Sequence, residues 1–204
     1  MQVHIKRTRI EDLRRGELIA AAHRVFMQHG LGGMTTARIC AEAGMSPGIL
    51  SYYFKGKEDV LFAMVRLNNR LLMEDVAVRL TAARTRWQRF LAIVEGNFPA
   101  GVYEQNVASA WLSVVAASSK NERFARLQAV FYRRLRSNLR SVFKDVLNAD
   151  RFVLMERMIS SLIDGLWLRK SAGDPLGRDD AVAALTIVVE RLLTESERRQ
   201  LKET

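Results

Sequence analysis

The chain of 204 residues is poor in cysteine and histidine. Its one cysteine, Cys40, has no partner for an internal disulfide. The three histidines, His4, His23 and His29, lie in the N-terminal part without the spacing of a metal site or a catalytic triad. We therefore expect no catalytic residue, no metal site, no cofactor and no enzymatic activity. Cys40 is expected to be a small buried residue within a helix.

Long apolar runs are also absent. No stretch approaches the roughly 20 apolar residues that a membrane-spanning helix needs. The N-terminal stretch lacks the apolar core of a signal peptide. We therefore expect a cytoplasmic protein without a membrane partner. With 49% hydrophobic and 26% charged residues, the composition is that of a globular protein.

Breakers of helices are scarce, because the chain has three prolines and 12 glycines. Long apolar runs of period 3.6 and the lack of alternating strand patterns predict an all-α fold with about nine helices. The expected helices cover residues 10–29, 35–43, 46–53, 57–81, 84–96, 105–119, 122–147, 151–171 and 178–201. Residues 1–9 are expected to form a loose basic arm, which either touches DNA or is a disordered end.

Residues 35–57 carry the most informative pattern. Thr35 is placed to cap a helix, and Gly44 follows that helix as a residue able to adopt a left-handed conformation. Ser46 and Pro47 then start a second short helix, with Ser at the cap and Pro in the first turn. Two short helices joined by a tight turn indicate a helix-turn-helix motif, although an ordinary helical hairpin has the same periodicity.

The outer face of the second helix is unusually small, so its backbone can approach the floor of a DNA major groove. Tyrosine hydroxyls and lysine ammonium groups beside it can contact phosphates. We expect Pro47, Gly48, Ser51 and Tyr52 to lie nearest to base edges. The predicted DNA-binding residues are Thr35, Thr36, Pro47, Gly48, Ser51, Tyr52, Tyr53 and Lys57.

The segment resembles the DNA-binding domain of the TetR family of bacterial repressors. The matching pattern is T-T-x-x-I-x-x-x-A-G-M-S-x-G-x-L-x-Y-Y-F at residues 35–54, followed by Lys57, Glu58 and Leu61. The resemblance implies a three-helix DNA-binding head at residues 1–56. It also implies a ligand-binding and dimerisation domain at 57–204, in which helix 57–81 connects the two parts and transmits movement.

Four further segments resemble the BetI-like branch of that family. They are EGNF at residues 95–98, AWL at 110–112, RRLRSNL at 133–139 and IDGLWLR at 163–169. The resemblance implies a repressor of choline-to-glycine-betaine genes that responds to choline. One departure is that Ser113, Val114 and Val115 occupy a turn where the branch usually carries further aromatics. A regulator of an unrelated pathway that answers another small ligand is therefore the alternative.

Aromatic residues are frequent in the C-terminal part, and aromatic rings can hold a quaternary ammonium group by cation–π attraction. A carboxylate such as Asp164 would add opposite charge. The predicted ligand-binding residues are Phe98, Trp111, Tyr132, Asp164 and Trp167. Plain core packing of the rings, with a structural hydrogen bond for Asp164, is the other interpretation.

The last two long helices carry apolar stripes that can pair with their copies in a homodimer. A two-fold dimer would suit a palindromic, double-stranded DNA operator. The net charge of +10 favours a polyanionic partner, although residues 120–151 are more basic than the helix-turn-helix, with nine Lys and Arg against three Asp and Glu. A basic architectural DNA-binding protein without an effector is a further alternative.

Overall fold

The computed structural model describes residues 2–119 and 121–203. These residues form ten helices and no strand, so the all-α prediction is confirmed. The chain divides into two compact units between Asn68 and Asn69, and each unit is described below by itself. Of the predicted domain boundary at residues 56 and 57, the structure shows only that α4 (Lys57–Ala82) runs unbroken from one unit into the other. The functional boundary stays a prediction.

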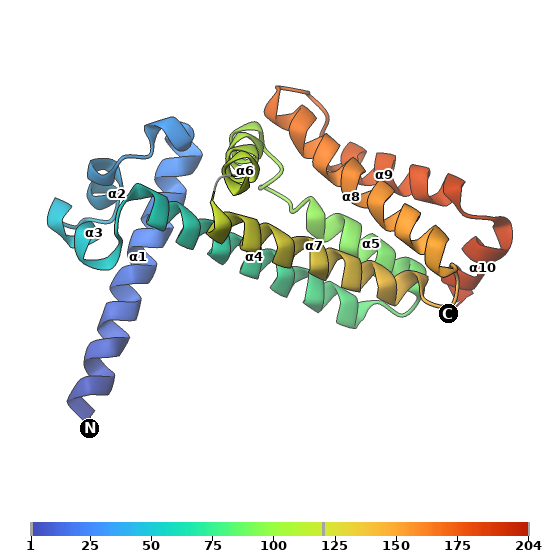
Figure 1. Ribbon diagram of the computed structural model, residues 1–204, viewed down its shortest axis with the longest axis horizontal. Coiled ribbons are helices and arrows are strands. Elements are labelled where there is room, and N and C mark those ends of the chain that lie inside the picture. Colours follow the sequence, from blue (N-terminus) through green and yellow to red (C-terminus); the bar gives the residue numbers. More distant parts are fainter. Residues whose placement is uncertain (1, 120, 204) are drawn as a thin grey trace. The chain divides into compact units, whose positions relative to one another are not determined.

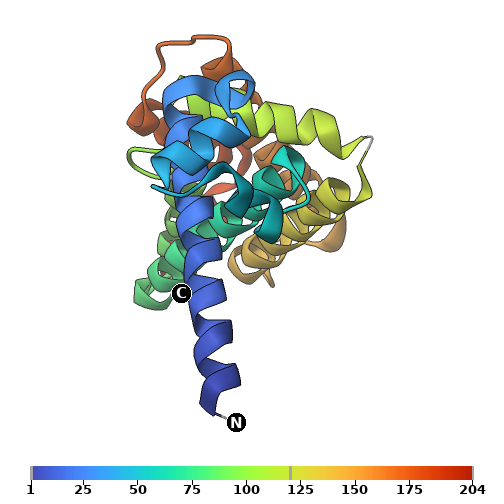
Figure 2. The ribbon, with the colours of Figure 1, turned by 90° about the vertical axis from the view of Figure 1, so that its left-hand side faces the viewer.

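The N-terminal unit contains α1 (Gln2–Gly33), α2 (Thr36–Glu42), α3 (Pro47–Tyr53) and the first part of α4 (Figure 1). Helix α1 starts at Gln2, so the prediction of a loose arm was wrong for the backbone of residues 2–9. No glycine or proline precedes Gly16, and nothing therefore interrupts the helix. The N-terminal half of α1 extends beyond α2 and α3, as Figure 2 shows with this unit facing the viewer.

Two glycines fix the turns of this unit. Gly30 interrupts the regular part of α1 with a φ of 64°, and Gly44 follows α2 with a φ of 63°. Both values lie in the left-handed region that side chains with a Cβ rarely adopt. The predicted stripe of α1, Leu18, Ala22, Val25 and Phe26, is buried, and α1 packs against α2, which in turn packs against α3. Cys40 is buried within α2, as expected.

The C-terminal unit contains the remainder of α4 and six further helices. These are α5 (Arg86–Asn97), α6 (Gln105–Ser118), α7 (Glu122–Phe143), α8 (Ala149–Ser171), α9 (Arg178–Leu192) and α10 (Glu195–Glu203). Helix α5 packs against α7, and α6 packs against both α7 and α8. One continuous apolar core joins them, with Phe90, Phe98, Phe143, Leu139 and Leu185 among its fully buried side chains.

The structure has one helix more than the sequence predicts, because the expected helix 178–201 is two helices. The backbone of Leu193 is extended, with a ψ of 142°, and its side chain is buried. Thr194 and Glu197 then cap α10 reciprocally. The Glu197 amide donates to the Thr194 hydroxyl at 3.3 Å, and the Thr194 amide donates to the Glu197 carboxylate at 2.8 Å.

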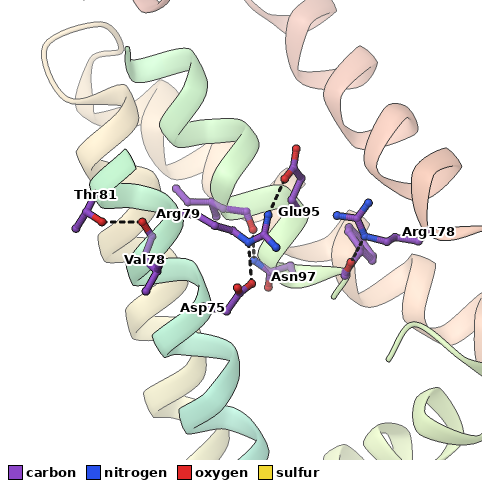
Figure 3. Close-up of polar contacts among 9 residues, drawn as sticks. Asp75, Val78, Arg79, Thr81, Glu95, Asn97 and Arg178 are labelled. Atoms are coloured by element: carbon purple, nitrogen blue, oxygen red, sulfur yellow. Dashed lines mark hydrogen bonds and ion pairs between the residues drawn. The ribbon is translucent and has the colours of Figure 1, made fainter. Parts of the chain in front are cut away.

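Helices α4 and α5 approach closely at Gly96. A Cβ atom on this glycine would lie 2.3 Å from Cγ2 of Val76, so only glycine fits without a shift of the Val76 side chain. Arg79 of α4 also reaches α5 (Figure 3). Its guanidinium bonds Asp75 on its own helix at 2.7 Å and Glu95 on α5 at 2.9 Å. The pair of helices is thus joined by packing and by charge.

Candidate functional site

Neither a metal centre nor a membrane span is evident in the described part of the chain. Among residues 2–119 and 121–203, no group of three or more His, Cys, Asp or Glu side chains could hold a metal ion. None of the described helices is long and apolar enough to cross a bilayer. The chemistry of the molecule therefore has to be sought in its surfaces and its aromatic interior.

The first candidate surface is the outer face of α3. Ser46 occupies the N-cap position and Pro47 the first turn, as predicted, but the Ser46 side chain makes no capping hydrogen bond. Leu50 is 1% exposed and points into the core of the unit. Pro47, Gly48, Ser51 and Tyr52 are exposed together on the opposite side. This face carries only small groups and one phenol.

The other predicted DNA contacts border α3. The Thr35 hydroxyl accepts from the Arg38 amide at 3.3 Å and so caps α2, as predicted. Thr36 and Tyr53 are half-buried, whereas Lys57 is exposed at the start of α4. The Lys57 ammonium donates to the carbonyl of Leu31 at 2.9 Å, which joins the start of α4 to the end of α1. The eight predicted residues therefore lie on one continuous segment of the same unit.

Two tyrosines form the largest feature of this surface. The rings of Tyr52 and Tyr53 meet edge to face, with centroids 4.9 Å apart. The Tyr52 hydroxyl donates to Glu11 of α1 at 3.3 Å, while 66% of the residue is exposed. Its ring is thus held in a defined direction and remains open to a partner. Such a surface can contact sugar and phosphate and place a helix backbone against base edges.

The second candidate site lies in the aromatic interior of the C-terminal unit. Trp167 of α8 stacks on Phe98, with ring centroids 6.4 Å apart. It also meets Tyr103 edge to face, with centroids 5.0 Å apart. The ring of Trp111 on α6 lies beside the same indole, with centroids 6.3 Å apart. Three of the five predicted ligand residues therefore meet around Trp167. Tyr103 also belongs to this cluster, since its hydroxyl donates to the carbonyl of Leu166 at 3.0 Å.

Phe98 and Trp167 also hold the end of α5 in place. The indole N–H of Trp167 donates to the carbonyl of Asn97 at 3.1 Å. Arg178 of α9 donates to the carbonyl of Phe98 at 2.7 Å, as the dashed line beside Arg178 in Figure 3 marks. Phe98 is fully buried, whereas Trp111 is partly exposed. Packing therefore accounts for the positions of Phe98 and Trp167, and Trp111 offers the accessible ring.

The remaining two predicted residues, Tyr132 and Asp164, are joined directly. The Tyr132 hydroxyl on α7 donates to Oδ2 of Asp164 on α8 at 2.6 Å. Burial raises the pKa of the Asp164 carboxyl, and this hydrogen bond partly opposes the rise. Burial, together with the bond to Asp164, raises the pKa of Tyr132 to about 12. Tyr132 is therefore a neutral donor throughout the physiological range.

The outer surface of α8 and α9 carries several exposed apolar side chains. Leu154, Met158 and Leu168 of α8 are exposed, and so are Ile187 and Leu192 of α9. A shallow groove between the two helices is lined entirely by apolar side chains. The lining residues are Met158, Ile159, Leu162, Leu185, Val188, Val189 and Leu192. Exposed apolar surface of this kind is typical of a protein–protein interface.

Two family models match the chain. Residues 18–64 match the model described as bacterial regulatory proteins of the TetR family. Residues 86–194 match the model described as the C-terminal domain of BetI-type transcriptional repressors. The first match contains the helix-turn-helix, and the second contains all five predicted ligand-binding residues.

Individual relatives agree with both matches. The chain is 34% identical over 179 residues to the HTH-type transcriptional regulator BetI of Brucella abortus, covering 88% of this chain and 89% of the relative. It is 38% identical over 160 residues to BetI of Vibrio parahaemolyticus, covering 78% and 80%. A structure of a putative transcriptional regulator from Saccharomonospora viridis in complex with choline has the same fold, with a TM-score of 0.75 and 23% identity. That match covers 86% of this chain and 95% of the other.

Proposed function

Since the chain belongs to the TetR family and carries a BetI-type C-terminal domain, we propose that choline or a related quaternary ammonium compound controls its binding to an operator. The protein is a DNA-binding transcriptional repressor of the ligand-responsive TetR type. Its proposed place of action is the cytoplasm, and its proposed targets are genes of glycine betaine biosynthesis. The observation that supports the DNA-binding role most directly is the exposed face of α3, whose small side chains let the helix backbone enter a major groove.

The proposed active form is a homodimer. The apolar face of α8 and α9 supports this, because Leu154, Met158 and Ile187 are exposed to water in the single chain. A second copy placed on it would bury these side chains in a four-helix interface. Two copies of α3 would then read the two halves of a palindromic operator, about one helical turn apart. We expect Ile187→Glu to give a monomer in sedimentation experiments and to lose tight operator binding.

The proposed control uses the C-terminal unit. An effector that prefers one conformation of this unit weakens operator binding by the difference in its affinity for the two states, typically about 5- to 150-fold. Helix α4 supports such coupling, because it belongs to both units without a break. The partly exposed Trp111 and the carboxylate of Asp164 provide a ring face and a negative charge for a cation.

Operator binding is tested with duplexes selected from a random pool and measured by gel shift. Tyr52→Ala should weaken binding of the selected duplex by at least about tenfold, since it removes a contact near the base edges of the major groove. Its melting temperature should not change, because Tyr52 is 66% exposed. Val78→Ala, an equally exposed position in the C-terminal unit, is the matched control. Unchanged affinity of Tyr52→Ala would contradict the assignment.

The same assay separates the alternatives. Selection of a palindromic sequence supports a repressor, whereas equal binding of all duplexes at fixed salt would indicate an architectural protein. Release of the operator by choline supports the proposed effector. Release by another metabolite and not by choline would indicate a regulator of an unrelated pathway.

A further inference from the structure

Two side chains of α1 reach the C-terminal end of α3. Glu11 accepts a hydrogen bond from the Tyr52 hydroxyl at 3.3 Å. The guanidinium carbon of Arg15 lies 4.8 Å from the centroid of the Phe54 ring, which is a cation–π contact with the residue that ends α3. Glu11 and Arg15 are four residues apart and therefore lie on one face of α1. One turn of α1 thus contacts the end of α3 at two points.

The two aromatic residues differ in how firmly the rest of the unit holds them. Phe54 is 2% exposed, so the core fixes the position of its ring. Tyr52 is 66% exposed and packs edge to face on Tyr53. An exposed tyrosine samples several rotamers, and a partner that needs one of them has to bear the entropy cost of fixing it. The bond to Glu11 selects one direction of Tyr52 before a partner binds and so reduces that cost.

The same bond limits what the Tyr52 hydroxyl can recognise. The hydroxyl has a single proton, which it donates to Glu11, so toward a third group its oxygen can only accept. Phosphate oxygens also only accept, and the Glu11 carboxylate repels them. Base edges in the major groove offer donors, which are the amino groups of adenine and cytosine. The geometry therefore suits a contact of Tyr52 with a base edge better than a contact with a phosphate.

The charge of Glu11 alone would oppose DNA binding, because a carboxylate beside the DNA-reading face repels a polyanion. Asp12, the next residue of α1, is exposed and has the same charge, but the Tyr52 hydroxyl donates to Glu11. If charge were the only effect, removal of either carboxylate would tighten binding. If Glu11 positions Tyr52, its removal weakens binding of the operator, and removal of Asp12 does not.

We infer that Glu11 is a positioning residue of the DNA-binding surface. It holds Tyr52 so that the tyrosine contacts a base edge, and it thereby contributes to the selection of the operator sequence. The inference rests on the proposed function, because it requires Tyr52 to contact DNA. It adds a residue of α1 that lies outside the helix-turn-helix and 41 positions before Tyr52 in the sequence.

The test measures binding of the full-length protein, at one salt concentration, to the selected operator duplex and to a scrambled duplex of the same composition. The ratio of the two dissociation constants reports sequence specificity. Glu11→Ala should bind the operator at least about threefold more weakly, and the scrambled duplex no more weakly than the unaltered protein does. Asp12→Ala is the matched control and should keep the ratio. Loss of a phosphate contact would instead weaken binding of both duplexes alike.

Two further variants identify the hydrogen bond as the cause. Glu11→Gln keeps a side-chain oxygen that can accept from Tyr52 and should keep the specificity ratio. Tyr52→Phe removes the hydroxyl and should lower the ratio. In the Tyr52→Phe background, Glu11→Ala should lower the ratio no further, because both changes remove the same bond. Melting curves of all variants establish that they are folded.

The outcomes separate this inference from the proposed function. An unchanged ratio in Glu11→Ala, or equal weakening with both duplexes, would overturn the positioning role. Loss of specificity in Glu11→Gln, or additive effects of Glu11→Ala and Tyr52→Phe, would overturn it as well. In each of these cases the DNA contact of Tyr52 stands if Tyr52→Ala weakens operator binding. Unchanged affinity of Tyr52→Ala would overturn both.

Discussion

The two candidate sites of this molecule are built in different ways. The predicted DNA contacts follow one another from Thr35 to Lys57 and lie on α2, on α3, at the N-cap of α2 and at the first residue of α4. The predicted effector residues extend from Phe98 to Trp167 and come from α6, α7, α8 and the residue that ends α5. A surface encoded locally can change its side chains without loss of the fold. A site that shares its side chains with the core cannot.

Hydrogen bonding shows the same difference. On the DNA-binding side, the hydroxyls of Thr35 and Tyr52 have partners within their own unit. Between α7 and α8, by contrast, Oδ1 of Asp164 is buried without a hydrogen-bond partner. The two hydroxyls of the first surface are thus held within their own unit, whereas Asp164 keeps one buried carboxylate oxygen unpaired.

The largest effect is expected for Phe98→Ala. Phe98 is fully buried against Trp167 and Tyr103, so its removal should lower the free energy of unfolding by about 3–5 kcal/mol. Urea unfolding followed by circular dichroism measures this change. Trp111→Ala removes a partly exposed ring and should lower the free energy of unfolding by less. An equal or greater loss in Trp111→Ala would contradict the division between core and accessible ring.

Gly96→Ala should lower the free energy of unfolding by a smaller amount. Its new Cβ would lie 2.3 Å from Cγ2 of Val76, and overpacking of this kind costs about 1–3 kcal/mol. The sign should reverse in a Val76→Ala background, where the nearest Val76 carbon would be Cβ at 3.5 Å and alanine favours helix by up to about 1 kcal/mol. A double-mutant cycle of unfolding free energies measures the coupling. Additive effects would show that the close approach is not the cause.

Loss of a local cap should have a moderate effect in the N-terminal unit. Thr35→Ala removes the hydroxyl that accepts from the Arg38 amide and should cost about 0.5–2 kcal/mol. Ser46→Ala is the matched control, because Ser46 occupies an N-cap position without a side-chain hydrogen bond. Thermal melting should therefore separate the two variants. A similar loss in both would mean that the helices depend on tertiary packing instead of their caps.

Asp164→Asn should give the smallest change in stability, and this change should be a gain instead of a loss. Burial raises the pKa of Asp164 above its usual 3.8, so the unaltered protein loses stability as pH rises through the raised folded-state value. Asparagine still accepts from Tyr132 and carries no charge. At pH 7 the variant should therefore melt at a higher temperature than the unaltered protein.

At low pH the Asp164 carboxyl is protonated and neutral in both the folded and the unfolded protein. The gain in stability of Asp164→Asn should therefore vanish below about pH 4. The same variant should bind choline more weakly at pH 7. A gain that is independent of pH would show that the charge of Asp164 is not its source. Such a trade between stability and binding is frequent in functional sites.

Most of the fold follows from local patterns in the sequence. The positions of Thr35, Gly44, Ser46 and Pro47 predict the helix-turn-helix, and the structure has its caps and turn there. The break before α10 was missed, although Thr194 and Glu197 have the spacing of a capping box. An apolar stripe that continues across a short turn conceals the end of a helix. Tertiary burial of Leu193 decides that break.

The predicted effector residues stay a prediction. The structure joins two of them, Tyr132 and Asp164, by a hydrogen bond between α7 and α8. Tyr103 was noticed as an aromatic residue, yet its contact with Trp167 depends on how α8 lies beside the loop before α6.

By itself, the sequence determined that the chain is helical and that α3 presents a small exposed face with two tyrosines. These properties depend on caps, breakers and a period of 3.6 residues, which act over a few positions. Only the tertiary structure decided which aromatic rings are buried and which polar atoms lack partners. Burial and hydrogen bonding between α7 and α8 depend on contacts between residues far apart in the chain, such as Tyr132 and Asp164, and no local pattern specifies them.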